Sequence, residues 1–324
     1  MAWQSSCCTY NFPQREDGLE NIENPASGKS LKLLNEHPAL PWILLLILSF
    51  IWGSSFILIK KGLEVFPPDQ VGTIRVTFAF LILLPIAVKH ITSVYKNYWR
   101  RILALGFLSN LIPAVLFSVA ETGLSSSLTG ILNSLTPLMT MLVGIFAFSI
   151  KIKKFQVIGL AVGLAGSIMI SLIGERGSIG TFNYFTIYVI IATICYGIGG
   201  NLIKSHLSHI NSIILTSLTM IGIGPIALGY LLTTDFFSRM GNVEGAWESL
   251  GFIFLLGAVG TALALILFNR LIQLTTAIAA SSVTYLIPIV AVMWGIVDGE
   301  NLFALHFAGM ALIIAGVYAT NRFK

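Results

Sequence analysis

The chain has 324 residues, of which 56% are hydrophobic and only 10% are charged, and its mean hydropathy is +0.86. A soluble domain needs far less apolar sequence for its core, so the composition excludes an ordinary soluble protein and indicates an integral membrane protein. The net charge of +5 does not indicate a nucleic-acid partner, because in a membrane protein the placement of Lys and Arg matters more than their total.

The first segment of the chain, residues 1–38, is polar. It contains Pro, Gly, Asp and Glu and lacks the apolar core of a signal peptide. We therefore expect a disordered cytoplasmic tail that precedes an uncleaved first helix.

Ten stretches free of Asp, Glu, Lys and Arg follow this tail: 39–59, 76–88, 102–120, 122–150, 155–174, 177–203, 207–234, 249–269, 271–297 and 301–321. All but one hold about the 20 residues that a helix needs to cross the hydrocarbon layer. The exception, 76–88, can span only if its helix starts near Val71, which places Arg75 about one turn inside. The sequence thus predicts an all-α membrane protein with ten transmembrane helices.

The two halves of the chain repeat one pattern. An offset of 151 residues aligns Pro137 with Pro288, and an offset of 144 residues aligns WGSSFILIK with YGIGGNLIK. Each half, 39–174 and 183–323, is therefore a predicted unit of five helices. Because five is odd, the second unit must enter the membrane in the opposite sense from the first, which gives inverted repeats.

Charge placement agrees with this inversion. The loop in FSIKIKK, residues 148–154, is basic, whereas its counterpart in GIVDGEN, residues 295–301, is acidic. Since cytoplasmic loops of membrane proteins carry an excess of Lys and Arg, we expect the first loop in the cytoplasm and the second outside. Both termini are then cytoplasmic.

Several motifs carry a family resemblance: WGSSF in the first helix, the Arg of GTIRVTFAFLILLP in the second, SSSLTGILNSLTPL in the fourth, and ASSVTYLIPIVAVMWGIVDGE in the ninth. With these motifs the chain, from residue 39 to about 323, resembles EamA-type permeases of the drug/metabolite transporter superfamily. The resemblance implies a permease or exporter of the bacterial inner (plasma) membrane. It implies a small-molecule solute but not which one, since similar proteins export amino acids, metabolites or drugs.

The sequence departs from the family pattern at one place. The Gly-Glu step of the family is present after the ninth helix as Gly299 and Glu300, but Ser149 and Ile150 occupy the equivalent place in the first half. A role that needs a symmetric pair of acids is therefore not supported.

Two prolines at equivalent positions indicate a binding site. Proline frees the carbonyl four residues earlier, which is that of Asn133 for Pro137 and that of Thr284 for Pro288. Helices interrupted at matched positions in two repeats are the best sequence pointer to a transporter's binding site. The alternative is a kink whose free carbonyl is satisfied by a neighbouring Ser or Thr.

Aromatic and ionisable residues complete the candidate site. Trp52, Tyr196 and Tyr285 could line the same cavity, although lipid-facing or core positions are the alternative. Arg75 could bind a carboxylate there, or could extend to the headgroups. Glu121 lies in a short turn between two helices, where a solvated acid is the main reading and a role in gating or coupling is the alternative.

The sequence contains no motif for other chemistry. It lacks a G-x-x-x-x-G-K-[ST] loop for ATP, an HExxH metal pair and a GxSxG nucleophile. We expect no catalytic residue, metal or cofactor, and transport by alternating access between the repeats. A membrane-embedded enzyme or a scaffold is the alternative. The glycine spacing in 159–166, with Gly309 and Gly316, most simply allows close helix contact, and a homodimer formed through these glycines is the alternative.

Overall fold

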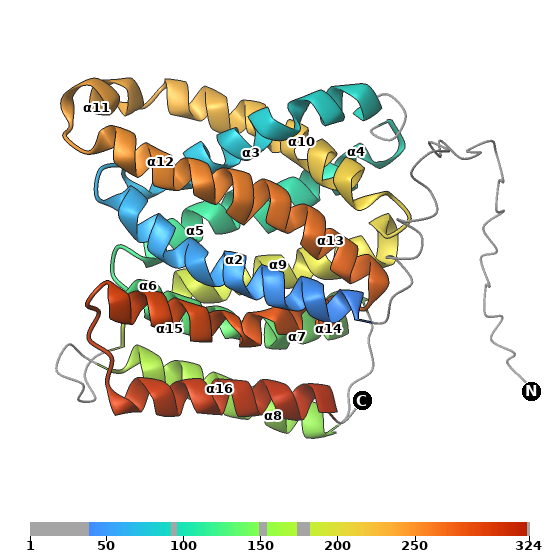
Figure 1. Cartoon of the computed structure of the whole chain (residues 1–324). Coiled ribbons are helices and arrows are strands. Elements are labelled where there is room, and N and C mark those ends of the chain that lie inside the picture. Colours follow the sequence, from blue (N-terminus) through green and yellow to red (C-terminus); the bar gives the residue numbers. More distant parts are fainter. Residues whose placement is uncertain (1–38, 92–95, 149–153, 174–181, 323–324) are drawn as a thin grey trace, which may run out of the picture. The chain divides into compact units, whose positions relative to one another are not determined.

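The computed structural model describes residues 39–91, 96–148, 154–173 and 182–322, and every regular element in these ranges is a helix (Figure 1). The chain divides into an N-terminal unit, Met1–Leu40, and a compact unit, Pro41–Lys324. Only the last two residues of the first unit are described, so the predicted tail at 1–38 lies outside the described residues.

The first half of the compact unit contains three long helices and two interrupted ones. Its elements are α2 (Leu40–Leu63), α3 (Pro68–His90), α4 (Lys96–Gly106), the π-helical turn η2 (Phe107–Leu111), α5 (Ile112–Ala120), α6 (Ser126–Leu132), the 3-10 turn η3 (Asn133–Leu135), α7 (Thr136–Phe148) and α8 (Lys154–Ser171).

The second half repeats this order and adds two elements, the π-helical turn η4 and the short helix α11. Its elements are α9 (Thr186–Leu202), the π-helical turn η4 (Ile203–Leu207), α10 (Ser212–Leu232), α11 (Phe236–Asn242), α12 (Ala246–Gly257), the π-helical turn η5 (Ala258–Leu263), α13 (Ala264–Leu274), α14 (Ala277–Ser281), the 3-10 turn η6 (Ser282–Tyr285), α15 (Ile287–Val297) and α16 (Ala304–Arg322).

Within the described residues, eight helical segments are long and apolar enough to cross a membrane: Leu40–Leu63, Pro68–His90, Asn97–Ala120, Ser126–Phe148, Thr186–Leu207, Ser212–Leu232, Ala246–Leu274 and Ala277–Val297. Two shorter apolar helices, Ala161–Ile170 and Ala304–Gly316, lie in α8 and α16. The chain is therefore an all-α membrane protein. Ten spans stay a prediction.

The second span differs from its predicted bounds. The helix α3 begins at Pro68, three residues before Val71, because Pro67 is extended (ψ 158°) and Pro68 occupies the first turn, where its missing N–H costs nothing. Arg75 therefore lies about two turns inside the helix instead of one.

Equivalent helices of the two halves pack against each other in opposite directions. Asp69 at the start of α3 accepts a hydrogen bond of 2.8 Å from Tyr230 near the end of α10. Ser127 at the start of α6 donates a bond of 3.3 Å to the carbonyl of Ala291 in α15, while α7 packs on α14. Figure 1 shows the interrupted helices α6–α7 and α14–α15 side by side.

The glycine-spaced helices α8 and α16 form the third such pair. A methyl group on Gly166 would lie 2.7 Å from the carbonyl oxygen of Gly309, and one on Gly316 would meet Gly159 and Gly163. These glycines thus allow close contact within one chain. The alternative that they form a homodimer has no support from this packing, and dimerisation stays untested.

Candidate substrate-binding site

The cavity of the compact unit is formed where regular helices are interrupted. The π-helical turns η2 and η5 begin at Phe107 and Ala258, which are equivalent positions of the two halves, and the 3-10 turns η3 and η6 also correspond. Each turn contributes at least one polar side chain to a common cavity: Ser109 and Asn110 from η2, Thr261 from η5, Asn133 from η3 and Thr284 from η6. π-Helical turns arise often at functional sites because the extra residue redirects side chains.

The cavity has a volume of about 100 Å³ and combines polar side chains with aromatic rings. Trp52 packs edge-on against Phe268 with ring centroids 4.9 Å apart, and Phe117 stacks on Tyr196 at 5.9 Å. The indole N–H of Trp52 donates to the carbonyl of Gly260 at 3.0 Å, so this ring is held in one orientation. The walls are therefore apolar surfaces with fixed polar groups between them.

Arg75 is the cation of this cavity. Its side chain is only 8% exposed, and its Nε donates to Thr261 Oγ1 at 3.2 Å. No carboxylate lies within ion-pair distance of its guanidinium among the described residues. A buried cation is costly unless an anion or several hydrogen bonds compensate it. Arg75 is thus available to an anionic group that enters the cavity.

The carbonyl freed by Pro137 does not face the cavity unsatisfied. The Asn133 carbonyl accepts the N–H of Thr136 and also its Oγ1, at 2.7 Å, and this hydroxyl contacts Asn133 Oδ1 at 3.1 Å. A tight 3-10 turn therefore forms where an unpaired carbonyl was expected. This agrees with the alternative interpretation, a kink whose free carbonyl is satisfied by a nearby Thr. The Asn133 side chain still lines the cavity.

Five of the nine predicted site residues line this one cavity: Trp52, Arg75, Asn133, Tyr196 and Thr284. The other four do not. Pro137 and Pro288 are buried in their helices, Tyr285 packs against the core, and Glu121 lies in the turn before α6. The prolines shape the helices without lining the cavity.

Sequence reasoning missed Asn110 and Ser109, which also line the cavity. Asn110 Oδ1 and Ser109 Oγ are buried and have no hydrogen-bond partner within the described part of the chain. A signal was present in the repeat, because Asn110 and Thr261 are equivalent polar residues in otherwise apolar spans. These two oxygen atoms are free acceptors beside the cavity.

The carboxyl group of Glu121 is buried, which differs from the expectation of a solvated acid. Both of its carboxylate oxygens are buried, and neither has a hydrogen-bond partner in the described ranges, so the reading as a solvated acid is wrong. The turn is covered by the segment before α9, where Phe185 packs on Gly123 and Asn183 donates to the Gly123 carbonyl at 2.8 Å. Burial raises the pKa of Glu121 well above its ordinary value.

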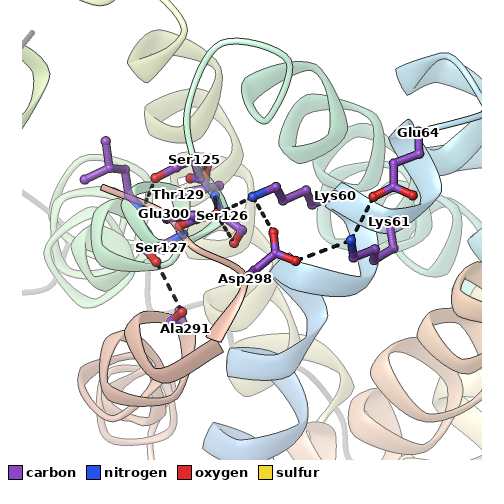
Figure 2. Close-up of polar contacts among 11 residues, drawn as sticks. Lys60, Lys61, Glu64, Ser125, Ser126, Ser127, Thr129, Ala291, Asp298 and Glu300 are labelled. Carbon is purple, nitrogen blue, oxygen red and sulfur yellow. Dashed lines mark hydrogen bonds and ion pairs between the residues drawn. The ribbon is translucent and has the colours of Figure 1, made fainter. Parts of the chain in front are cut away.

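A polar cluster lies at one end of the bundle, and we call it the Glu300 cluster: Lys60, Asp298, Glu300, Ser126 and Ser127 (Figure 2). Glu300 accepts hydrogen bonds from Ser126 N at 3.0 Å, Ser126 Oγ at 2.7 Å and Ser127 N at 3.0 Å. A carboxylate at these N–H groups satisfies the start of α6 and interacts favourably with the helix dipole.

The same cluster joins α2 to the segment between α15 and α16. Lys60 Nζ lies 2.6 Å from Asp298 Oδ2 and 3.1 Å from Glu300 Oε1, and Figure 2 shows it reaching toward both acids. Lys61 lies 3.3 Å from Asp298 Oδ1. Three segments from both halves of the chain are thus held together at this end.

The charges of the cluster are mutually stabilised. Lys60 lowers the pKa of Asp298 by its hydrogen bond. Burial raises the pKa of Glu300, but the bonds from Ser126, Ser127 and Lys60 outweigh burial, so its pKa is lowered. Both acids are therefore ionised at neutral pH.

The opposite end has an equivalent lysine. Lys204, which aligns with Lys60 in the repeat, donates to the carbonyls of Ile272, at 3.3 Å, and Thr275, just before α14. Since α14 and α15 form one apolar span, Ala277–Val297, Lys204 and the Glu300 cluster lie at its two ends. The predicted basic loop with Lys151 and Lys153 lies outside the described residues.

These features define a class. A bundle of apolar helices that encloses a cavity lined by polar and aromatic side chains, with different lysine contacts at its two ends, is typical of a membrane transporter. The model of the EamA-like transporter family matches residues 40–172 and 184–322. The chain belongs to this family and carries its domain twice.

Curated relatives agree with this assignment. An "uncharacterized transporter" of Archaeoglobus fulgidus is 26% identical over 87% of this chain and 98% of its own length. The inner membrane transporter YedA of Escherichia coli K12 is 24% identical over 84% of this chain and 88% of its own length. A "probable amino-acid metabolite efflux pump" of Salmonella typhimurium is 26% identical over 85% of this chain and 92% of its own length.

A solved structure shares the fold. It aligns with a TM-score of 0.61 at 12% identity and covers 86% of this chain and 95% of the other. This likeness shows the fold alone. The family match and the apolar helices place this chain among membrane transporters.

Proposed function

We propose that this protein is a secondary transporter that moves a small solute with an anionic group through the central cavity. The observation that carries this proposal is Arg75, a buried guanidinium that faces the cavity without a carboxylate partner in the described residues. A solute carboxylate would supply the missing charge and make charge-assisted hydrogen bonds.

The size and chemistry of the cavity favour a metabolite over a drug. A volume of about 100 Å³ is below the range typical of sites for drug-sized ligands. Asn133 and Thr284 provide polar contacts, and Trp52 and Tyr196 provide apolar surface. The name of the Salmonella relative, an amino-acid metabolite efflux pump, supports a solute of this size.

Alternating access is the mechanism that we propose. The antiparallel packing of α3 on α10, α6 on α15 and α8 on α16 supports two inverted repeats around the cavity. The Glu300 cluster closes the end of the bundle that we assign to the outside. Lys204 bonds to carbonyls at the other end, which we assign to the cytoplasm together with both termini. Opening one end requires that its contacts break while the other end holds.

Binding can be tested with three probes that share one branched chain. Leucine carries a carboxylate and an ammonium group, 4-methylpentanoate only a carboxylate, and 3-methylbutylamine only an ammonium group. A ligand that binds the folded state raises the unfolding temperature of the purified protein. We expect both carboxylates to do so and the amine to have no effect.

Matched variants assign the effect to the cavity. Arg75→Gln should abolish the stabilisation by both carboxylates, whereas Arg100→Gln, at an exposed site on α4, should leave it unchanged. If Arg75→Gln does not fold, Asn133→Leu takes its place. Stabilisation by the amine alone would contradict the proposal of an anionic group.

Transport itself is tested in proteoliposomes. Radiolabelled leucine should cross the bilayer in the presence of the wild-type protein and be recovered chemically unchanged. Conversion to a product would favour the alternative of a membrane enzyme, and binding without flux would favour a scaffold.

A further inference from the structure

Glu121 is a buried carboxyl group that the proposed site does not use. It ends α5, and its N–H donates to the Phe117 carbonyl at 3.1 Å, so the backbone position is fixed. Its two carboxylate oxygens have no hydrogen-bond partner among the described residues. An ionised carboxylate in such a place is costly, whereas the protonated group is not, so the site favours a bound proton.

Charged groups of three other segments act on Glu121. The Glu300 carboxylate, in the segment after α15, disfavours its ionisation, while Lys60 of α2 and Arg75 of α3 favour it. Glu121 thus responds both to charges of the Glu300 cluster and to the cavity cation, Arg75.

Glu121 also contributes to the wall of a surface depression of about 430 Å³, together with Glu64 and Arg239. On the cavity side, Phe117 of the same helix stacks on Tyr196. Glu121 therefore lies beside a depression open to the surface, while its carboxylate oxygens are buried.

We infer that Glu121 is a proton-binding site whose occupancy is linked to the binding of an anionic group at Arg75, an inference that rests on the proposed function. In the binding step one carboxylate oxygen takes a proton from a hydronium ion, whose O–H bond breaks to leave water as the O–H bond of the carboxyl group forms. In the reverse step the carboxyl O–H bond breaks and water accepts the proton as hydronium. No electron transfer and no other reactant is needed.

The sign of the link follows from the charges. Arg75 lowers the pKa of Glu121, and an anion bound at Arg75 cancels this effect and adds repulsion. Solute binding therefore raises the pKa of Glu121 and causes proton uptake. By reciprocity, a proton on Glu121 strengthens anion binding by the same factor. Proton and anion would then be bound together.

The protonated carboxyl can be observed without any solute. Infrared difference spectra of the purified wild-type protein near neutral pH should show the carbonyl stretch of a protonated carboxylic acid, which Glu121→Gln should remove. Glu248→Gln, at an exposed site in the first turn of α12, is the matched control and should leave it unchanged. A band that is absent from the wild-type protein, or that persists in Glu121→Gln, would overturn the proton site.

The link to Arg75 is measured by calorimetry with 4-methylpentanoate. Titrations in buffers of different ionisation enthalpy give the number of protons taken up on binding, and we expect uptake of up to one proton within the range of about pH 5 to pH 9. Glu121→Gln should bind the probe without uptake, and Glu248→Gln should match the wild type. Equal uptake by wild type and Glu121→Gln, or none by either, would overturn the link.

The infrared and calorimetric experiments distinguish a failure of this inference from a failure of the proposed function. If 4-methylpentanoate does not bind the wild-type protein at all, the anionic solute and the link to Arg75 both fail. The infrared spectra still decide whether Glu121 binds a proton. If the probe binds the wild-type protein without proton uptake, the proposed function stands and the link between Glu121 and Arg75 fails.

Discussion

Individual polar side chains in this bundle are distinguished by the partners that they have or lack. Glu300 has four donors around it and is only 4% exposed, whereas Arg75 and Glu121 lack partners of opposite charge at bonding distance in the described part of the chain. A satisfied charge holds a structure together, and an unsatisfied one is a place for a ligand or a proton. The two kinds of residue therefore predict different outcomes of mutation.

Glu300→Gln should destabilise the protein in a pH-dependent way. It removes a carboxylate that accepts several hydrogen bonds, which is expected to cost about 1.5–3 kcal/mol for bonds to a charged group. Because the pKa of Glu300 is lowered in the folded state, its contribution is complete above the ordinary pKa of 4.5 and is lost as the pH falls through the lowered value. Unfolding temperatures of both proteins, measured from neutral to acid pH, should differ most at neutral pH and converge in acid. A difference in unfolding temperature that does not become smaller in acid would contradict this prediction.

Asn133→Leu should impair binding without loss of insertion. Asn133 lines the cavity, and its backbone carbonyl keeps the 2.7 Å hydrogen bond from Thr136 Oγ1 in the variant, whereas only the 3.1 Å contact of that hydroxyl with Asn133 Oδ1 is lost. We expect leucine flux in proteoliposomes to fall by at least about tenfold, the effect of losing one interaction worth 1.4 kcal/mol. Asn242→Leu, exposed on α11, is the control. Unchanged flux in Asn133→Leu would remove this residue from the site.

At the level of helices, the apolar runs and the prolines could be used to predict helical spans and their interruptions, but the π-helical turns could not be predicted. Long apolar stretches predict spans because the hydrocarbon layer leaves no other solution. A π-helical turn such as η2 or η5 needs only one extra residue in a helix and leaves the composition unchanged, so Asn110 and Ser109 were missed. The turn that contains Glu121 is packed by Phe185 and Asn183, which contact Gly123 and are distant in sequence. The local pattern therefore contained no sign of this packing.

The contact of α8 with α16 depends on glycine. Leucine at Gly166 would place side-chain atoms against the backbone of Gly309 and Ile313, where even a Cβ lies within 2.9 Å. Overpacking of this kind costs about 1–3 kcal/mol. Gly166→Leu should therefore lower the unfolding temperature, whereas Gly251→Leu, with no atom within 4 Å of its Cβ, should not. Equal effects of the two variants would show that the helix contact is not as close as described.

For the molecule as a whole, the sequence predicted the family and the all-helical membrane fold, and the matched family model confirms the family in both halves. It also aligned Lys60 with Lys204, but it could not show that one meets acids and the other helix carbonyls. The partners of a lysine are decided by packing between segments far apart in the chain. Inversion of the repeats, the cytoplasmic termini and the number of spans remain predictions.

Alternating access makes a prediction about which end of the bundle is open. If the Glu300 cluster closes the outer end, breaking it should shift the population toward states open to the outside. In a variant with Cys195, Cys7 and Cys8 replaced by Ser, Thr284→Cys places one thiol in the cavity. Adding Lys60→Ala should raise its labelling rate by a membrane-impermeant thiol reagent applied outside, by about tenfold if the contact is worth 1.4 kcal/mol.

The control for this shift is a lysine at the same end that makes a weaker contact. Lys61 lies 3.3 Å from Asp298 but mainly pairs with Glu64 at 2.8 Å on the surface, and exposed pairs contribute little. Lys61→Ala should therefore leave the labelling rate near that of the parent. A rate that falls when Lys60 is replaced would place the Glu300 cluster on the cytoplasmic side. A rate that does not change would mean that other contacts keep this end closed.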